Sequence, residues 1–366
     1  MQYLSINRLD LTNFRNYSNF SLDLAGRSLI LTGCNGSGKT NFLEAISLFL
    51  PGRGLRRSAY QEMIQANKQT FSLHGVFDYN LSPLNIGTEF SCTYVSRKVK
   101  IDGEFCPLDD LTNYIRLNWL IPAMDGIFSG RDSEGRQFLD RLIFSLDSSH
   151  AKRLSDYDKL LRSRNKLLEN WRSNDIWLDA IELQLSEIAV AIAAARLDLV
   201  DQLNILFSEC NIHSFPRAFL EVNGFVEDNL LLTNAQEVED NFRLLLKNQR
   251  AIDAASGRTN IGIHRSKLTV SHYDKKITAK FCSTGEQKML LIGIILCHSQ
   301  LTKNLVGYCP ILLLDEIVSH LDYKHRETLF AFLLSLGGQF FVTGTDKNIF
   351  SSLGNEVEFF STDQCK

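Results

Sequence analysis

The sequence predicts an α/β protein in which a mixed β-sheet with an antiparallel β subdomain is interrupted by an inserted, mainly helical lobe. Three observations lead to this fold class: a glycine-rich segment between a strand pattern and a helix pattern, short alternating segments after residue 70, and long helical runs after residue 135. A chain of 366 residues is long enough for two lobes. We assign residues 1–130 and 262–366 to a head and residues 131–261 to the inserted lobe.

The N-terminal part of the head is predicted from its hydrophobic periodicity. Apolar and polar residues alternate through residues 3–32, which predicts two or three strands and ends in an apolar run. Apolar residues then recur at helical spacing from Thr40 to Phe49, before Pro51 and Gly52 stop the pattern. This part therefore reads as strand, glycine-rich loop and helix.

The next two regions differ in character. Short alternating strands from Thr70 to Cys106 predict an antiparallel sheet, with a tight turn at Asp102-Gly103. From Gly135 to about Cys210 the chain has long helical runs without sustained heptads, so we expect a helical lobe and no long coiled-coil arm. Strand character returns near Ala218 and again after Gly262.

Composition excludes several classes of protein. The formal net charge is −3, so any nucleic-acid contact must be a local patch. The eight cysteines include no Cys-x-x-Cys pair, which indicates reduced thiols and neither a zinc site nor a disulfide framework. We find no leader sequence and no uninterrupted apolar stretch long enough to span a membrane, and we place the protein in the cytoplasm without a membrane partner.

The most specific local signal is a P-loop of the pattern G-x-x-x-x-G-K-[ST]. In such a loop the glycines turn backbone N–H groups toward phosphate oxygens, and the positive end of the following helix favours the same anion. We expect Lys39 to reach the β- and γ-phosphates of ATP and to serve catalysis, and Thr40 to hold Mg²⁺. The loop comprises Gly33, Cys34, Asn35, Gly36, Ser37, Gly38, Lys39 and Thr40.

An apolar run from Cys309 to Leu314 ends in two carboxylates, Asp315 and Glu316. The run is too short for a typical helix and is expected to be a buried parallel strand. Asp315 at its tip is suited to Mg²⁺, and Glu316 to orienting or deprotonating the attacking water as the catalytic residue.

A third motif narrows the class to ABC-type ATPases. The segment beginning at Ser283 precedes an apolar helix and resembles the ABC signature, which in that class contacts the γ-phosphate held by the opposite subunit. A Ser and a Gly at a helix N-terminus form a second anion site. We assign Ser283, Gly285, Glu286 and Gln287 to this role in trans.

Two later segments resemble the D-loop and the switch of ABC proteins. The D-loop segment is Ser319 to Asp322, and Thr345 stands where transporters usually carry a switch His. The Gln of the usual Q-loop is not identified, and Pro122 to Asp125 occupies its neighbourhood. The fold class is thus an ABC-type P-loop ATPase head with an inserted helical lobe.

Shorter segments in order along the chain resemble the RecF family. Leu11 to Tyr17 is similar to its "NFRNY" segment, and Asn41 to Ile46 extends its P-loop. Gly135 to Arg141 resembles "RRxFLD" with Gln137 departing, Arg164 to Leu168 resembles "RNxLL", and Gly262 to Arg265 resembles "GPHR" with Ile263 departing. The resemblance covers almost the whole chain, and with it we include Arg15 and Asn41 among the nucleotide-binding residues.

Membership of the RecF family would imply a weak, DNA-stimulated ATPase that forms an ATP-dependent homodimer. It would also imply binding to duplex DNA beside single-strand gaps, and cooperation with RecO and RecR in loading RecA during recombinational repair and the SOS response. The alternative is the nucleotide-binding subunit of an ABC transporter. Three basic clusters are either solvated surface or phosphate contacts: Arg53, Arg56 and Arg57; Arg97, Lys98 and Lys100; and Lys275, Lys276 and Lys280. No interleaving of aromatic and basic residues of the stacking kind is evident.

Overall fold

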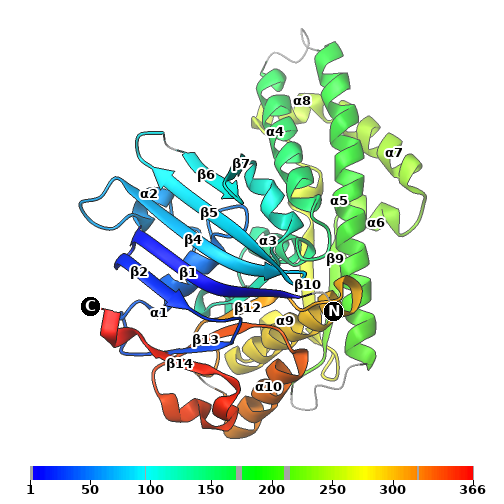
Figure 1. Cartoon of the computed structure of the whole chain (residues 1–366). Helices are drawn as coiled ribbons and strands as arrows, with labels where there is room; N and C mark the ends of the chain where they lie inside the picture. The colour runs from blue at the N-terminus through cyan, green and yellow to red at the C-terminus, as the bar shows by residue number, and fades with distance from the viewer. Residues whose placement is uncertain (1–2, 95, 170–174, 210–214, 320, 366) are drawn as a thin grey trace. The chain divides into compact units, whose positions relative to one another are not determined.

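The computed structural model describes residues 3–94, 96–169, 175–209, 215–319 and 321–365 (Figure 1). The chain divides into two compact units, each of which draws on separate parts of the sequence. Unit 1 comprises Met1–Asp125, Cys210–Pro216 and Lys288–Lys366, and unit 2 comprises Gly126–Glu209 and Arg217–Gln287.

The first sheet of unit 1 is parallel, in the order β14-β3-β13-β12-β8. All residues of β8, β12 and β13 are buried, which explains why these strands read as nearly continuous apolar runs. The strands are β3 (Leu29–Thr32), β8 (Leu117–Leu120), β12 (Ile311–Leu314), β13 (Phe340–Gly344) and β14 (Glu358–Ser361).

The second sheet of unit 1 is antiparallel, in the order β2-β1-β4-β5-β6-β7 (Figure 1). Burial alternates along β4 and β5, because successive side chains point to opposite faces. The predicted turn is confirmed: Asp102 and Gly103 both have positive φ, of 47° and 89°. The strands are β1 (Leu4–Phe14), β2 (Tyr17–Asp23), β4 (Thr70–Tyr79), β5 (Ser82–Ser91), β6 (Ser96–Ile101) and β7 (Glu104–Cys106).

Helix α1 packs against both sheets of unit 1. Phe42 of α1 contacts Phe20 of β2 and Phe341 of β13 through its ring. The helices of this unit are α1 (Lys39–Ser47), α2 (Tyr60–Met63) and α10 (Tyr323–Leu336), with the 3-10 helices η1 (Leu108–Asn113), η2 (Pro122–Met124), η6 (Lys347–Glu356) and η7 (Thr362–Cys365).

Helix α9 (Thr284–Val306) contains the division between the units at residue 287. Among the described residues it is the one helix that is long and apolar enough to cross a membrane, but 67% of its most apolar window is buried inside the protein. Such burial is typical of a core helix.

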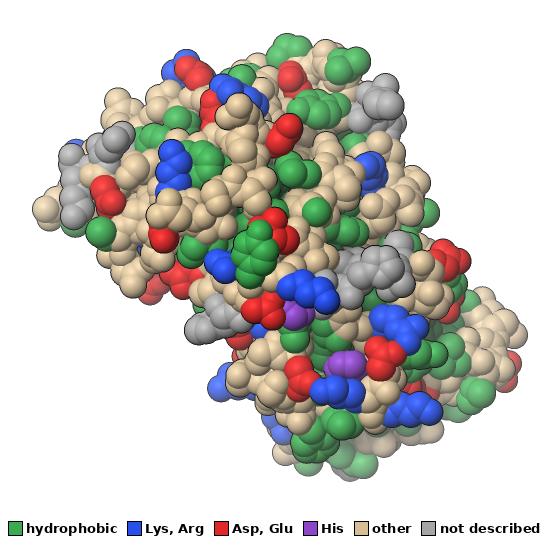
Figure 2. Space-filling view, turned by 90° about the horizontal axis from the view of Figure 1, so that it is seen from below, with side chains coloured by type: hydrophobic (Ala, Val, Ile, Leu, Met, Phe, Trp, Pro, Cys, Tyr) green, Lys and Arg blue, Asp and Glu red, His purple; other side chains and the backbone are tan. Residues whose placement is uncertain are grey.

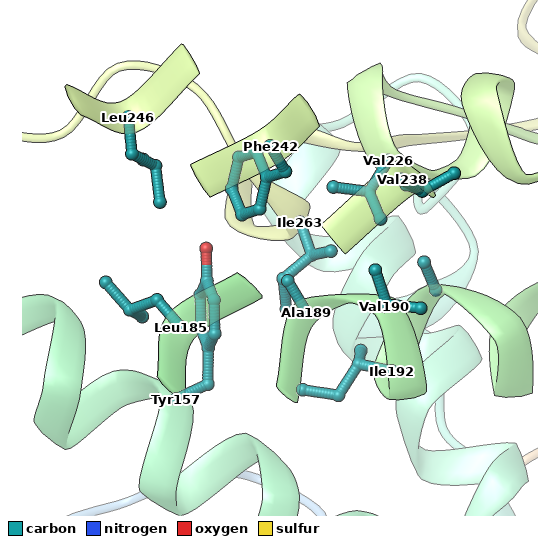
Figure 3. Packing of buried hydrophobic residues seen from close by; sticks show 11 residues of the cluster. Tyr157, Leu185, Ala189, Val190, Ile192, Val226, Val238, Phe242, Leu246 and Ile263 are labelled. Atoms are coloured by element: carbon teal, nitrogen blue, oxygen red, sulfur yellow. The ribbon is translucent and has the colours of Figure 1, made fainter. Parts of the chain in front are cut away.

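Unit 2 is mainly helical and has a small antiparallel sheet in the order β11-β10-β9. Its apolar core lies between α5 and the shorter helices α6 and α7, and includes Tyr157 of α4 (Figure 3). The helices are α3 (Asp132–Ile143), α4 (His150–Leu168), α5 (Asp175–Glu209), α6 (Phe225–Leu230), α7 (Ala235–Asn248), α8 (Arg250–Ser256), η4 (Ile263–Arg265) and η5 (Ala279–Phe281), and the strands are β9 (Ala218–Asn223), β10 (Lys267–His272) and β11 (Ile277–Thr278).

The inserted lobe was expected at residues 131–261, whereas unit 2 continues to Gln287. The reason lies in strand pairing. Strand β10 pairs with β9 in the register Lys267↔Asn223 to His272↔Ala218, so the segment after Gly262 belongs to the sheet of unit 2. Periodicity along one segment cannot show which distant strand that segment joins.

Candidate nucleotide-binding site

The P-loop of unit 1 joins the end of β3 to the start of α1. Gly33, Gly36 and Gly38 have positive φ of 149°, 81° and 109°, a backbone region that favours glycine. A Cβ on Gly33 would lie 2.5 Å from Thr362 Oγ1, and one on Gly38 would lie 2.5 Å from Asn16 Nδ2. The loop therefore needs glycine at these two positions for space as well as for conformation.

Lys39 is folded back over its own loop. Its Nζ donates hydrogen bonds to Gly33 O at 2.6 Å and to Cys34 O at 2.9 Å, and the residue is buried. The Cys34 N–H donates to Asp363 Oδ1 at 3.1 Å, and Ser37 is hydrogen-bonded to Thr362. The C-terminal segment thus holds the outer part of the P-loop in place.

The acidic residue at the end of β12 lies beside the P-loop helix. Thr40 Oγ1 donates to Asp315 Oδ2 at 2.9 Å. Burial raises the pKa of the Asp315 carboxyl, hydrogen bonds from Thr343 and Thr40 partly oppose that rise, and the nearby charge of Glu316 adds to it. A buried carboxylate with only hydroxyl partners is suited to a cation.

Thr343, which no sequence pattern singled out, joins the two acidic residues. Its hydroxyl donates to Asp315 Oδ1 at 2.8 Å and accepts from the Glu316 N–H at 2.8 Å. Thr343 is fully buried in β13. A hydroxyl among the apolar residues of this strand was the signal that could have found it.

Glu316 has a left-handed backbone, with φ of 50°. A residue other than glycine in this region costs on the order of 1 kcal/mol or more, and it persists because surrounding contacts impose it. Here the contacts are the hydrogen bond from its N–H to Thr343 and a hydrogen bond from Ser319 Oγ to its carbonyl oxygen at 2.6 Å. The backbone direction at Glu316 is therefore set by two side chains.

Arg15 and Asn41, which the family resemblance placed at the nucleotide, are hydrogen-bonded within the protein. The Arg15 guanidinium donates to the buried Glu44 carboxylate at 2.8 and 2.9 Å and to Ser58 Oγ at 2.8 Å. Asn41 donates to Asn16 Oδ1 at 2.7 Å and accepts from a guanidinium N–H of Arg56 at 2.8 Å. These contacts tie α1 to the loops around it.

A magnesium ion fits the hydroxyl and carboxylate that meet at Thr40 and Asp315. Mg²⁺ prefers oxygen ligands and is usually held by one or two protein groups together with waters and substrate phosphates. The described residues contain no group of three or more His, Cys, Asp or Glu side chains arranged to hold a metal. This pair is thus the natural candidate in unit 1.

The signature residues lie in unit 2, around the start of α9. The Ser283 hydroxyl and N–H donate to Glu286 Oε2 at 2.8 and 2.9 Å, in the manner of a capping box. A hydrogen bond from Lys275, followed by those from Ser283, lowers the pKa of Glu286 to about 2. A Cβ on Gly285 would meet nothing within 4 Å, whereas Gln287 is buried and donates to Cys282 O at 3.0 Å.

The expected D-loop and switch residues are in unit 1. Asp322 caps α10 by accepting from the His325 N–H at 2.9 Å, and Thr345 is exposed immediately after β13. His320 of the D-loop segment lies outside the described residues. In the neighbourhood of the Q-loop, Asp125 forms an ion pair with Lys288 at 3.7 Å.

Known proteins resemble this chain over nearly its full length. A family model, the RecF/RecN/SMC N terminal domain, matches residues 5–366. The DNA replication and repair protein RecF of Brucella suis biovar 1 is 46% identical over 363 residues, which cover 98% of this chain and 94% of the relative. The RecF protein of Rhizobium etli is 46% identical, over 98% of this chain and 97% of its own.

The chain belongs to the RecF family. The family predicted from the sequence is confirmed, and the alternative of a transporter subunit is set aside. Two solved structures, of the recombination mediator protein RecF-ATPrS and of RecF-ATP in the RecFOR pathway, match with TM-scores of 0.84 and 0.83 at 21% and 22% identity, and they cover 98% and 99% of this chain and 96% and 98% of their own. A SmcHead structure matches with a TM-score of 0.56 at 14% identity, over 98% of this chain and 93% of its own. The predicted α/β fold of an ABC-type ATPase head is thereby confirmed.

Several segments that resemble the RecF family form the ion-paired interior of unit 2. Asp140 accepts two hydrogen bonds from buried Arg196, at 2.8 and 2.9 Å. Buried Arg164 donates to Glu182 Oε1 at 2.9 Å and to Asp253 Oδ2 at 2.8 Å. Such fully paired charges hold helices in one arrangement.

His264, in the segment that resembles "GPHR", lies within hydrogen-bonding distance of Tyr157 Oη at 3.2 Å and Thr259 O at 3.0 Å. Burial lowers its pKa, which favours the neutral ring. Arg265 beside it is exposed. The geometry around His264 is that of a structural residue.

Proposed function

We propose that this protein is an ATP-dependent DNA-binding ATPase of recombinational repair, in which ATP binding assembles a homodimer on DNA beside single-strand gaps. The observation that carries the proposal is the convergence of the P-loop, Thr40 and the Asp315–Glu316 pair at one edge of the parallel sheet. Its relatives named RecF are DNA replication and repair proteins, and structures with the same fold are described as RecF-ATP in the RecFOR pathway. Cooperation with RecO and RecR in loading RecA, in the cytoplasm, belongs to this proposal.

The nucleotide would be held by the P-loop N–H groups and by Lys39, whose Nζ exchanges its two backbone carbonyls for phosphate oxygens. Arg15 and Asn41 would support the site, through Glu44 for Arg15 and through Asn16 for Asn41. Bound Mg²⁺, held by Thr40 and Asp315, would supply charge neutralisation at the phosphates.

Hydrolysis would be slow and would depend on the Glu316 carboxylate, which accepts a proton from the attacking water. Its backbone is fixed by Thr343 and Ser319, so the carboxylate starts from a defined direction. Hydrolysis removes the contact that joins the two protomers, and DNA is released.

Assembly would bring the signature of one protomer to the nucleotide of the other. In the free chain Ser283 is engaged with Glu286, so its hydroxyl must change partner when it meets a phosphate. Asp322 and Thr345 are exposed, and they are therefore available to the same interface. Both features are consistent with a site completed by a second copy.

The structure reduces the set of basic residues that are candidates for DNA contacts. Arg97 is buried and donates to the carbonyl oxygens of Leu48, Leu50 and Gly52, which removes it from the candidate phosphate contacts. Lys275 is paired with Glu286. On the face drawn in Figure 2, basic and acidic side chains of the described residues are intermingled, so this face carries no continuous basic surface.

The dimer is tested by sedimentation of the protein with short gapped duplex DNA, with and without ATP and Mg²⁺. The parent is compared with Ser283→Arg and with Ser82→Arg, a control at an exposed serine at the start of β5. We expect ATP-dependent dimers on DNA for the parent and the control, and monomers for Ser283→Arg. A parent that stays monomeric and unbound with ATP would refute the proposed function.

The timing role of hydrolysis is tested with Glu316→Gln. The amide keeps the size of the side chain and removes the base, so ATP binding is retained while the dimer and its DNA complex persist. The dissociation rate of labelled DNA is measured after addition of excess competitor. Dissociation as fast as that of the parent would exclude a role for Glu316 in release.

A further inference from the structure

The outward face of the antiparallel sheet of unit 1 contains a hollow of about 200 Å³. One row of paired residues crosses it, in the register His74↔Gly87, Gly87↔Lys100 and Lys100↔Phe105, from β4 to β7 (Figure 1). A Cβ on Gly87 would meet nothing within 4 Å. The hollow therefore exists because the residue at its floor has no side chain.

Two lysines and the exposed ring of Phe105 line this hollow, and the exposed ring of Tyr94 lies next to Lys98. Lys100 Nζ lies 4.5 Å from the centre of the Phe105 ring, and Lys98 Nζ lies 4.5 Å from that of Tyr94 and 5.9 Å from that of Phe105. Phe105 is 64% exposed and Tyr94 is 67% exposed. Large aromatic side chains this exposed retain free ring surface, and the ammonium groups lie over the rings.

The charges that face the hollow from all four strands leave it positive. Glu89 of β5 is paired in register with Lys98 and offsets one of the two lysines. His74 of β4 lies 3.3 Å from Asp10 of β1, which in turn forms an ion pair with Arg8. Lys100 remains without an opposing carboxylate among the residues that line the hollow.

We propose that this hollow binds one unpaired nucleotide of single-stranded DNA, with the base against Phe105 and the phosphate at Lys100 and Lys98. Aromatic rings beside basic groups are the usual means of binding single strands, because every base has a π face and every nucleotide has a phosphate. A base within a duplex has both faces stacked, so only an unpaired base can enter. The space above Gly87 accommodates the edge of that base.

This inference rests on the proposed function and deepens it, because it supplies a contact for the single-stranded part of a gap. No interleaving of aromatic and basic residues of the stacking kind was evident in the sequence. Tyr94, Lys98, Lys100 and Phe105 are spaced irregularly along the chain, and pairing of β6 with β7 brings Phe105 next to Lys100.

The first test is fluorescence anisotropy with a labelled oligothymidylate of about ten nucleotides, within the usual site size of single-strand binders, and with a duplex of the same length, both in the presence of ATP and Mg²⁺. Phe105→Ala is compared with Leu81→Ala, which removes an even more exposed apolar side chain at the β4–β5 turn. Removal of a stacking ring weakens single-strand binding by about five-fold or more. We expect that decrease for Phe105→Ala alone, with unchanged duplex affinity.

A second variant fills the hollow without disturbing the sheet. Gly87→Val places a β-branched side chain in open space on an interior strand, where valine is favoured over glycine. We expect single-strand affinity to fall as much as in Phe105→Ala, while the thermal midpoint does not fall. Undiminished single-strand binding by this variant would overturn the proposal.

The lysines are tested by the salt dependence of binding. Removing the side chain that neutralises one phosphate reduces the slope of log K against log salt concentration by about 0.7 for a single strand. We expect this decrease for Lys100→Ala, but not for Lys68→Ala, a control at an exposed lysine in the turn before β4. An unchanged slope for Lys100→Ala, or equal decreases for duplex and single strand, would contradict the inference.

The outcomes separate the two proposals. A parent protein that binds no DNA with ATP would refute the proposed function, and the hollow would lose its role with it. A parent that binds duplex with ATP, but whose single-strand affinity is the same in Phe105→Ala and Gly87→Val, would refute only the hollow.

Discussion

Thr343→Val removes a single hydroxyl from the interior of unit 1 and keeps the shape of the side chain. The hydroxyl makes two hydrogen bonds of 2.8 Å, one received from the Glu316 N–H and one donated to Asp315. A buried donor left without a partner costs about 1–3 kcal/mol, and a hydrogen bond to a charged group contributes about 1.5–3 kcal/mol. We expect the free energy of unfolding of unit 1 to fall by about 3 kcal/mol. This value is near the lower end of the sum of the two ranges, because Thr40 still donates to Asp315.

The loss is measured by urea unfolding with a reporter confined to unit 1, since two units need not unfold together. Trp119 of β8 is buried and pairs in register with Leu313 of β12. A background carrying Trp171→Phe and Trp177→Phe leaves it as the sole tryptophan, because the chain has three. The control is Thr343→Ser, which keeps both hydrogen bonds and loses a methyl group at about 0.8 kcal/mol.

The same change should slow ATP hydrolysis more than it weakens ATP binding. Thr343 sets the backbone direction of Glu316 from inside the sheet, and a shift of about 1 Å in the carboxylate that we propose to be catalytic can cost about a hundred-fold in rate. We expect a fall of about ten- to a hundred-fold in steady-state hydrolysis for valine and a smaller fall for serine. Equal stability and equal hydrolysis rates in the two variants would refute the reasoning.

Two further predictions concern the interior of unit 2 and the P-loop. Arg196→Met leaves Asp140 and Glu227 buried without their cation and should cost about 3–5 kcal/mol at neutral pH, measured by urea unfolding of unit 2. Burial alone would raise the pKa of the Asp140 carboxyl, but the Arg196 charge holds it below its usual 3.8. The parent therefore loses stability as the pH falls through that lowered pKa. In the variant the Arg196 charge is absent, and protonation removes the cost of burying Asp140 and Glu227 as charged groups. The difference in the free energy of unfolding between parent and variant should therefore shrink in acid. A difference that stays constant with pH would contradict the assignment. Gly33→Ala should abolish ATP binding and lower the thermal midpoint further than Gly36→Ala, because a Cβ at Gly33 meets Thr362 at 2.5 Å and one at Gly36 meets nothing within 4 Å; equal midpoints would contradict the clash.

Local patterns in the sequence were enough to predict the P-loop, its helix, the buried strand before Asp315 and the turn at Asp102-Gly103. Each of these depends on residues that are near neighbours in the chain. Glycines that suit positive φ, helical spacing and a short apolar run can each be recognised within about ten consecutive residues.

The tertiary structure decided the role of residues whose partners are distant in the chain. Thr343 meets Asp315 across the paired strands β13 and β12, and Arg15 meets Glu44 of α1, a partner that no spacing rule connects to it. Arg97, grouped by sequence with two nearby lysines, points to the buried face of β6 because successive side chains of a strand alternate.

By itself, the sequence determined the family and the α/β class and predicted the chemistry of the acidic pair, because these follow from residue types at fixed local spacing. Only the folded chain determined that β10 belongs to unit 2, that Thr343 positions Glu316, and that the glycine at position 87 opens a hollow beside Lys100 and Phe105. Strand register and side-chain direction depend on contacts between segments far apart, and no local pattern encodes them.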